Sequence, residues 1–230
     1  MAQVIFILNN PAVPENIGFS IRALKTMGFD KMRIVNGVDH NSVQTRKTAY
    51  GSHDVLKKVE TFSSLKEALA DVDLVVGTTA KKRSMRDHPI DVKELSGFLQ
   101  KKGTSIQNLA IVFGSEESGL SKEDLILCDV VSTVPLATTY PSLNLSQSVL
   151  LYAWELSGLS KEKKKKPKGV ENETNKTFTR ELEQLLEHLQ TGRSPAFHQK
   201  VRDRAQFLNE SDMKLALSLM GKLRRALKIN

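Results

Sequence analysis

Apolar runs alternate with helical patterns over the first 159 residues of the chain. Runs rich in Val and Ile predict β-strands at residues 3–8, 31–37, 73–79, 108–114 and 130–137, with a weaker strand near residues 57–62. Each run is almost continuously apolar, which is typical of strands buried on both faces. Helical patterns separate the runs, at residues 15–27, 43–49, 63–70, 91–101, 121–127 and 143–156. This alternation predicts an α/β fold with helices on both faces of a parallel sheet.

The last third of the chain has a different pattern. Residues 160–176 contain one apolar residue, one proline and a block of lysines, so we expect a flexible basic linker. Three helical patterns follow, at residues 177–190, 196–208 and 211–228. In the last of them, Met213, Leu217, Met220, Leu223 and Leu227 fall on one stripe. The sequence therefore predicts a domain over residues 1–159 and a small helical extension over residues 177–230.

Composition and charge narrow the class of protein. Hydrophobic residues make up 40% and charged residues 26% of the chain, as in a globular protein. We find no long apolar span and no signal peptide pattern, and the single cysteine, Cys128, agrees with a reducing compartment, so a cytoplasmic protein with no membrane partner is expected. Residues 1–159 hold equal numbers of basic and acidic groups, so the net charge of +8 arises beyond residue 159. A basic tail is typical of nucleic-acid binding, but also of a solvated surface.

Several kinds of catalytic site have no motif in this sequence. The five histidines are scattered, and neither HExxH nor CxxC occurs, so no metal site is expected. The GxSxG elbow of serine hydrolases is absent, and so is the GxGxxG turn of dinucleotide-binding proteins.

Three polar clusters remain, each after a predicted strand, where ligands bind in α/β sheets. The first contains Asn16, Gly18 and Arg22 at a helix start, where free backbone N–H groups and the helix dipole could hold a phosphate. The alternative is a helix cap with a surface arginine.

The second cluster surrounds Glu116 and Glu117. Gly114 and Gly119 flank these residues and would allow a ligand to approach the backbone, unless the segment is a plain strand-to-helix turn.

The third cluster opens the predicted helix 143–156. Ser142 and Asn144 are suited to capping this helix. Further polar residues, Ser146, Gln147 and Ser148, exceed what capping needs. A structural role and a ligand-binding role remain open for this cluster when it is taken alone.

Taken together and in this order, the clusters resemble the three motifs of the SPOUT superfamily, in its TrmH-like branch of RNA 2′-O-ribose methyltransferases. The segments that carry the resemblance are NIGFSIR at 16–22, FGSEESGL at 113–120 and VPLATTYPSLNLSQSV at 134–149. The segments ALKTMGF, LVVGTTAKKR and HQKVRDRAQFL are most similar to the TrmJ and LasT subgroup.

The resemblance implies a C-terminal trefoil knot in the α/β domain, a homodimer, and S-adenosyl-L-methionine as cofactor. The knotted loops would hold the cofactor. The matching positions are Thr78, Thr79, Ala80, Gly114, Val134, Pro135, Leu136, Ser142, Leu143 and Asn144.

The resemblance also implies catalytic roles. Arg22 matches the arginine that the family treats as catalytic, and we expect it to hold the target phosphate and stabilise the developing alkoxide, because a guanidinium is not expected to lose its proton. Asn16 would orient Arg22 or the ribose, and Glu116 would pin the arginine or the loop. Ser142 and Asn144 would fix substrate and cofactor.

The expected substrate is RNA, above all tRNA, methylated in the anticodon loop at position 32. Alternatives are an rRNA 2′-O-methyltransferase, a non-catalytic RNA-binding dimer of the same fold and, least favoured, a dehydrogenase. RNA contacts are expected from Lys81, Lys82, Arg83, Arg86, Arg202, Arg204, Arg224 and Arg225.

Overall fold

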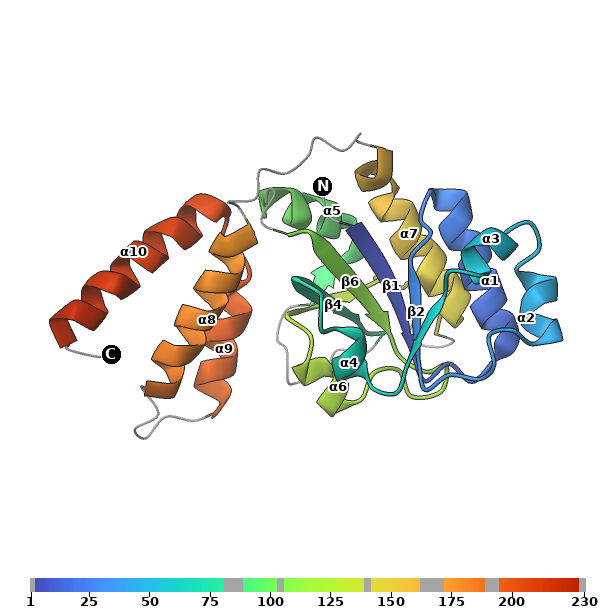
Figure 1. The fold of residues 1–230 in the computed structure, drawn as a ribbon, viewed down its shortest axis with the longest axis horizontal. Coiled ribbons are helices and arrows are strands. Elements are labelled where there is room, and N and C mark those ends of the chain that lie inside the picture. The colour runs from blue at the N-terminus through green and yellow to red at the C-terminus, as the bar shows by residue number, and fades with distance from the viewer. Residues whose placement is uncertain are drawn as a thin grey trace. The chain divides into compact units, whose positions relative to one another are not determined.

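A seven-stranded parallel sheet forms the centre of the larger part of the molecule (Figure 1). The computed structural model describes residues 3–80, 89–102, 106–138, 142–161, 172–188 and 195–227. The strand order is β3-β2-β1-β6-β4-β7-β5, and every neighbouring pair runs parallel. The strands are β1 (Gln3–Asn9), β2 (Met32–Val35), β3 (Glu60–Phe62), β4 (Leu74–Thr78), β5 (Ile90–Asp91), β6 (Asn108–Phe113) and β7 (Val130–Thr133).

Helices cover both faces of the sheet, as the sequence pattern predicts. Alternate residues of β1 point to opposite faces, so Ile5 and Ile7 join one core and Phe6 the other. The first core includes residues of α4 (Leu65–Ala68) and α6 (Lys122–Ile126). On the other face Phe6 stacks with Phe113, whose ring meets that of Tyr152 edge-on. Tyr152 belongs to α7 (Leu145–Lys161), which lies beside α1 (Pro14–Met27).

Two short elements were not predicted from the sequence. They are β5 and the one-turn helix α3 (His53–Leu56), and both are too short to leave a periodic pattern. The remaining helices of this part, α2 (Val43–Thr48) and α5 (Val92–Lys101), agree with the prediction within one residue at each end. Helix α7 starts two residues later than expected and runs five residues further.

Local capping follows the sequence closely. Gly28 ends α1 in the left-handed conformation, with φ of 90°. Ser121 and Asp124 form a capping box at the start of α6, each side chain accepting the other's backbone N–H. Cys128 is buried and behaves as a small core residue.

The C-terminal part consists of α8 (Asn172–His188), α9 (Pro195–Ala205) and α10 (Glu210–Leu227). Phe178, Met213 and Met220 are at its centre. Leu223 was expected on the same stripe but is exposed, because Arg224 takes the position facing α8 and pairs with Glu181.

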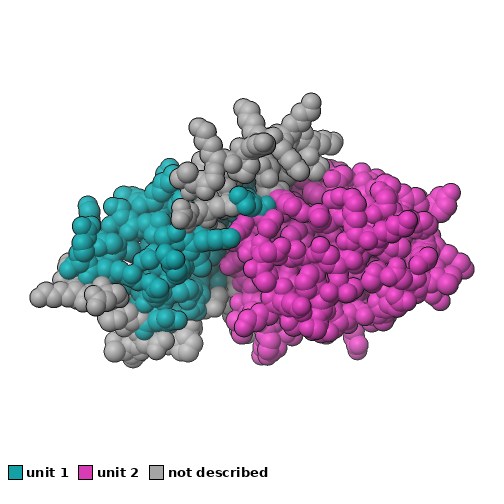
Figure 2. All heavy atoms as spheres, in the orientation of Figure 1, with its two compact units in different colours: residues 1, 97–107, 164–230 teal, residues 2–96, 108–163 magenta. Residues whose placement is uncertain are grey.

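Backbone contacts divide the chain into two compact units, coloured separately in Figure 2. One comprises Ala2–Ser96 and Asn108–Lys163, and the other Gly97–Gln107 and Lys164–Asn230 together with Met1. Helix α7 reaches Lys161 and α8 starts at Asn172, so both ends of the predicted linker are helical, and residues 162–171 lie outside the described part. Within the described residues, no helix is both long and apolar enough to span a membrane.

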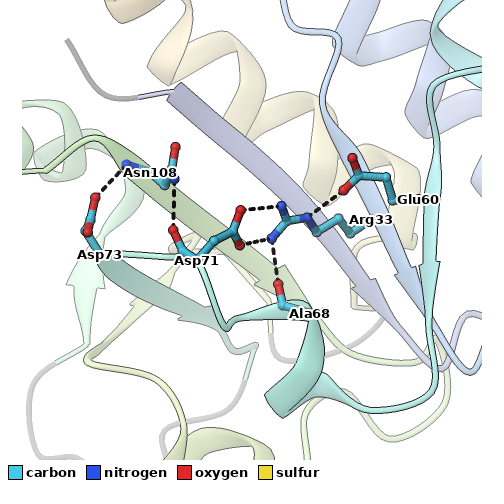
Figure 3. A network of polar contacts seen from close by, with 6 residues as sticks. All are labelled: Arg33, Glu60, Ala68, Asp71, Asp73 and Asn108. Carbon is cyan, nitrogen blue, oxygen red and sulfur yellow. Dashed lines mark hydrogen bonds and ion pairs between the residues drawn. The ribbon is translucent and has the colours of Figure 1, made fainter.

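A network of ion pairs and hydrogen bonds lies at the amino-terminal ends of the strands (Figure 3). Arg33 on β2 donates two hydrogen bonds to Asp71, at 2.6 and 2.8 Å, one to the carbonyl oxygen of Ala68 and one to Glu60. Asn108 on β6 donates through its side chain to the carbonyl oxygen of Asp71. The guanidinium lowers the pKa of the Asp71 carboxyl, chiefly through these hydrogen bonds. The network joins β2, β3, β6 and the segment before β4.

We expect Arg33→Met to lower the free energy of unfolding by about 1 to 3 kcal/mol, because it leaves Asp71 and the Ala68 carbonyl without their donor. The lowered pKa of Asp71 means that this contribution is present above its unfolded pKa and is lost as the pH falls through the native value. The difference in unfolding free energy between wild type and variant, measured in urea, should therefore shrink as the pH falls below about 4. Lys58→Ala, which removes an exposed pair with Asp30, is the matched control and should cost less than about 1 kcal/mol. If both variants lost the same free energy of unfolding, the Arg33 network would contribute no more than an exposed ion pair.

Candidate functional site

The loops that carry the three polar clusters all lie at the carboxyl ends of the strands. Leu8 pairs with Phe113 in the β1–β6 ladder, and Gly77 pairs with Val112 in the β4–β6 ladder. Because all these strands are parallel, the segments after β1, β4, β6 and β7 emerge side by side. Residues about 100 positions apart in the sequence thus come within hydrogen-bonding distance.

Glu116 anchors the entry to α1. Its carboxylate accepts hydrogen bonds from the backbone N–H groups of Ala12 (2.9 Å) and Val13 (3.3 Å) and from the side-chain amide of Asn16 (2.9 Å). A carboxylate therefore lies where the sequence suggested a phosphate, and it also complements the positive end of the α1 dipole. Of the two roles expected for Glu116, the structure shows contacts with the loop and not with Arg22.

Asn16 continues this chain of hydrogen bonds into the third cluster. Its side-chain oxygen accepts from the amide of Asn144 at 2.9 Å. The oxygen of Asn144 in turn accepts from the backbone N–H of Ser146 at 2.8 Å and from its hydroxyl at 2.7 Å, and so caps α7. The hydrogen bonds between Glu116 and Asn16 and between Asn16 and Asn144 connect one residue from each of the three motifs. We call these three residues the amide–carboxylate chain.

A pocket lies beside this chain, at the carboxyl ends of β4, β6 and β7. Its lining is mostly apolar side chains and hydroxyls, with carboxylates at Glu116 and Glu117. Within the described lining there is no lysine or arginine. The lining residues are Thr78, Thr79, Ala80, Phe113, Gly114, Ser115, Glu116, Glu117, Ser118, Gly119, Leu120, Val134, Leu136, Ser142, Leu143, Leu145, Ser148 and Tyr152.

The glycines of the second cluster shape the loop itself. A Cβ atom on Gly114 would overlap the backbone of Gly119 and Leu120, and Gly119 has a φ of +69°. Ser115 and Gly119 form an isolated antiparallel bridge. Gly114 is therefore required by a tight turn, and it also lines the pocket, so its expected place beside a cofactor remains a prediction.

The floor of the pocket is rigid. The Tyr152 hydroxyl donates to the hydroxyl of Ser132 at 3.0 Å, which donates to the carbonyl oxygen of Ile90 at 2.9 Å. Burial raises the pKa of Tyr152, so its phenol remains a neutral donor at all ordinary pH values. Thr78 and Thr133 bond to backbone carbonyls and hold the loops after β4 and β7. Sequence patterns did not single out Tyr152, because its helix position is typical of an ordinary core residue.

The pocket collects eight of the ten residues expected to bind a cofactor. Pro135 and Asn144 do not line it; Asn144 takes part in the amide–carboxylate chain instead. Phe113, Ser118, Leu120, Leu145, Ser148 and Tyr152 line it without having been predicted as cofactor residues.

The residues expected to bind RNA lie elsewhere. Arg22 is exposed on α1, outside the pocket lining. Gly18, one turn earlier, approaches α2 closely. Lys81, Lys82, Arg83 and Arg86 are outside the described residues.

In the C-terminal unit, two of the four predicted arginines are engaged internally. Arg202 forms a two-pronged ion pair with Glu183, at 2.6 and 2.7 Å, and Arg224 pairs with Glu181 and bonds to Gln184. Arg204 and Arg225 are exposed.

Comparisons with known proteins agree with the motifs. The model of the SpoU rRNA Methylase family matches residues 3–154. The uncharacterized tRNA/rRNA methyltransferase LasT of Escherichia coli (strain K12) is 43% identical over 157 residues, which cover 68% of this chain and 69% of LasT. The tRNA (cytidine-2′-O-)-methyltransferase TrmJ of Methanocaldococcus jannaschii is 31% identical over 158 residues, covering 67% of each chain.

Solved structures show the same fold. The crystal structure of TrmJ from Z. mobilis ZM4 matches with a TM-score of 0.65 and 26% identity, over 97% of this chain and all of that one. A probable methyltransferase from Bordetella pertussis Tohama I matches with a TM-score of 0.64 and 33% identity, over 69% of this chain and 96% of that one.

We expect Glu116→Gln to lower the free energy of unfolding by about 1 to 2 kcal/mol, because an amide has one acceptor oxygen for three N–H donors and brings its own N–H₂ group against them. Urea unfolding measures the loss. Glu117→Gln is the matched control, since Glu117 is an exposed neighbour for which the structure shows no hydrogen bond within the described residues. A Glu116 variant as stable as the Glu117 variant would show that the amide–carboxylate chain does not hold the loops.

Proposed function

The chain belongs to the SpoU rRNA Methylase family, and we propose that it transfers a methyl group from S-adenosylmethionine to a ribose 2′-hydroxyl of tRNA, at position 32 of the anticodon loop. The amide–carboxylate chain carries this proposal, because it brings one residue from each motif together beside a pocket. The names of the TrmJ relatives, 2′-O-methyltransferases acting on tRNA, support the choice of substrate.

The chemistry of the pocket fits S-adenosylmethionine. When bound, this cofactor supplies an electrophilic methyl group on a positively charged sulfur. Glu116 and Glu117 provide negative charge, while Leu120, Val134 and Leu136 provide apolar surface for a ring. A nicotinamide dinucleotide is less favoured, because the sequence lacks the GxGxxG turn that binds its phosphates.

Arg22 acts on the RNA side of the site. It is exposed on α1 and absent from the pocket lining, so its guanidinium is available to a phosphate of the substrate. A fixed positive charge near the ribose stabilises the alkoxide that develops as the 2′-hydroxyl loses its proton to solvent. Positioning the hydroxyl against the methyl group supplies much of the remaining rate.

Asn16, Asn144 and Glu116 hold the site together and do not act as acid or base. The side-chain oxygen of Asn16 accepts a hydrogen bond from Asn144, and that of Asn144 accepts one from the backbone of Ser146. Ser142 is exposed and lines the pocket, so its hydroxyl is placed to meet cofactor or ribose.

The protein acts as a homodimer in this proposal. Trp154 is 63% exposed and Phe19 45% exposed, and Leu150 and Leu151 are also exposed on α7. Residues 150, 151 and 154 share one face of that helix. A second copy would cover this apolar surface, which a monomer would leave in water.

The C-terminal unit contributes to RNA binding in this proposal, together with residues 81–86. The whole excess of positive charge arises beyond residue 159, and Arg204 and Arg225 are exposed. Because Arg202 and Arg224 are held by carboxylates, they contribute less than their exposed neighbours.

Methyl transfer from labelled S-adenosylmethionine tests the function directly. Unmodified tRNA and rRNA transcripts serve as alternative substrates, and mapping of methylated riboses identifies the nucleotide. Label in a tRNA ribose at position 32 supports the proposal, label in rRNA alone redirects it, and binding of RNA without transfer shows a non-catalytic protein.

We expect Arg22→Ala to reduce methyl transfer by about 100-fold or more, because the variant loses the charge that stabilises the alkoxide. Arg22→Lys should also fail, since a point charge does not reproduce the planar fork. Calorimetric titration with S-adenosylmethionine should give the wild-type affinity for both variants. Near wild-type turnover in either variant would overturn the role of Arg22.

We expect Trp154→Glu to convert the dimer into a monomer at micromolar concentration, because the charge would be buried in the interface. Sedimentation velocity gives the answer. Leu215→Glu is the control, since Leu215 is 72% exposed on α10 in the other unit. Dissociation by the Leu215 variant alone would move the interface to α10, and a wild-type monomer would exclude the dimer.

A further inference from the structure

An exposed aromatic residue stands next to two cations at the end of α2. Tyr50 is 74% exposed, the largest exposed fraction among the large hydrophobic side chains of the described residues. Arg46 and Lys47 precede it by about one helical turn and are exposed as well. We call Arg46, Lys47 and Tyr50 the α2 surface. Exposing a tyrosine ring so fully gains nothing for the fold.

The α2 surface is fixed rigidly to α1. The hydroxyl of Thr45 donates to the carbonyl oxygen of Pro14 at 3.0 Å, and Ser42 caps the helix by accepting from the N–H of Thr45. Gly18 has no side chain to separate the helices, and a Cβ there would overlap Thr48 and the carbonyl of Thr45. Thr45 and Ala49 are buried, so α2 turns its opposite face to solvent (Figure 1).

Arg22 lies along the same side of α1. Gly18, Arg22 and Lys25 are spaced four and three residues apart and therefore share one face of the helix. Gly18 contacts α2, and Lys25 pairs with Asp54 on α3 at 2.5 Å. Arg22 falls between these two contacts, and Tyr50 belongs to the segment that connects α2 with α3. These contacts place α2, the α2–α3 connection and Arg22 on one side of α1.

The charges of the α2 surface favour the binding of an anion. Arg46 donates through Nε to the carbonyl oxygen of Asn41, which fixes its direction, and its own carbonyl oxygen is bonded to His53. Neither Arg46 nor Lys47 forms an ion pair with any described residue. The nearby carboxylate of Asp54 is already paired with Lys25.

We propose that the α2 surface binds unpaired nucleotides of the substrate RNA next to the target ribose, with a base stacked on Tyr50 and phosphates on Arg46 and Lys47. The inference rests on the proposed function. Unstacked bases of RNA loops bind aromatic side chains by stacking, which a base-paired helix does not permit. A methyltransferase that reaches a ribose in a loop would gain both position and selectivity from such a platform.

Binding measurements with two RNA probes test the inference. We expect Tyr50→Ala to weaken binding of an unmodified tRNA transcript on the order of tenfold, as the loss of one stacked base requires, while Tyr50→Phe keeps wild-type affinity. A fully base-paired RNA duplex should bind wild type and Tyr50→Ala equally. Lys47→Gln should make the dependence of affinity on salt less steep, by a slope of about 0.7 for one released counterion. Lys66→Gln, which changes an exposed lysine on α4 under the opposite face of the sheet, should leave the slope unchanged.

The outcomes separate the inference from the function on which it rests. Wild type that neither binds nor methylates RNA overturns the proposed function and the inference with it. Active wild type with unchanged affinity in Tyr50→Ala and Lys47→Gln overturns the inference alone. A loss of affinity in Tyr50→Ala that accompanies a changed sedimentation coefficient also overturns it, because the effect then belongs to assembly. Loss on the tRNA transcript alone, with S-adenosylmethionine affinity and sedimentation unchanged, supports it.

Discussion

The parallel pairing of β1 with β6 is the constraint on which the site depends. Because Leu8 pairs with Phe113, the carboxyl ends of β1 and β6 lie side by side, and the loops that follow them start next to each other. Glu116 then lies three residues beyond β6 and reaches the N–H groups that precede α1. A shift of register by one residue would turn the alternate side chains of β1 to the wrong face and separate these loops. The hydrophobic core therefore sets the positions of polar groups that it does not contact.

Hydrogen bonds to a charged acceptor give this arrangement its strength. The carboxylate of Glu116 accepts three hydrogen bonds and faces the positive end of α1. Asn16 is buried and passes the connection to Asn144, which caps α7. Helices α1 and α7 are thereby fixed at their amino-terminal ends, and the amino-terminal end of α7 borders the pocket. Such support from rigid elements is what a site needs to hold its ligands in a defined geometry.

The molecule separates its charges by location. The described lining of the pocket contains carboxylates, hydroxyls and apolar groups, whereas exposed cations lie on α1 and α2 and in the C-terminal unit. This division matches the two reactants of the proposed reaction, a cationic methyl donor and a polyanionic RNA. The net charge alone is therefore a weak guide to which residues could bind RNA. Arg202 and Arg224 count toward the excess but are held by Glu183 and Glu181.

The sequence by itself determined the α/β class, the main strands and helices, and the identity of the three polar clusters, because periodicity, capping residues and turn residues act over a few positions. The capping box of Ser121 and the left-handed Gly28 are of this kind. The two-residue strand β5 left no pattern, and neither did the role of Gly18, which depends on how closely α2 approaches. Only the tertiary structure decided that Glu116 bonds to the loop before α1, and that Gly114 lies too close to Gly119 and Leu120 for any side chain. Those assignments depend on contacts between residues far apart in the chain, and a local pattern carries no record of which distant group will be the partner.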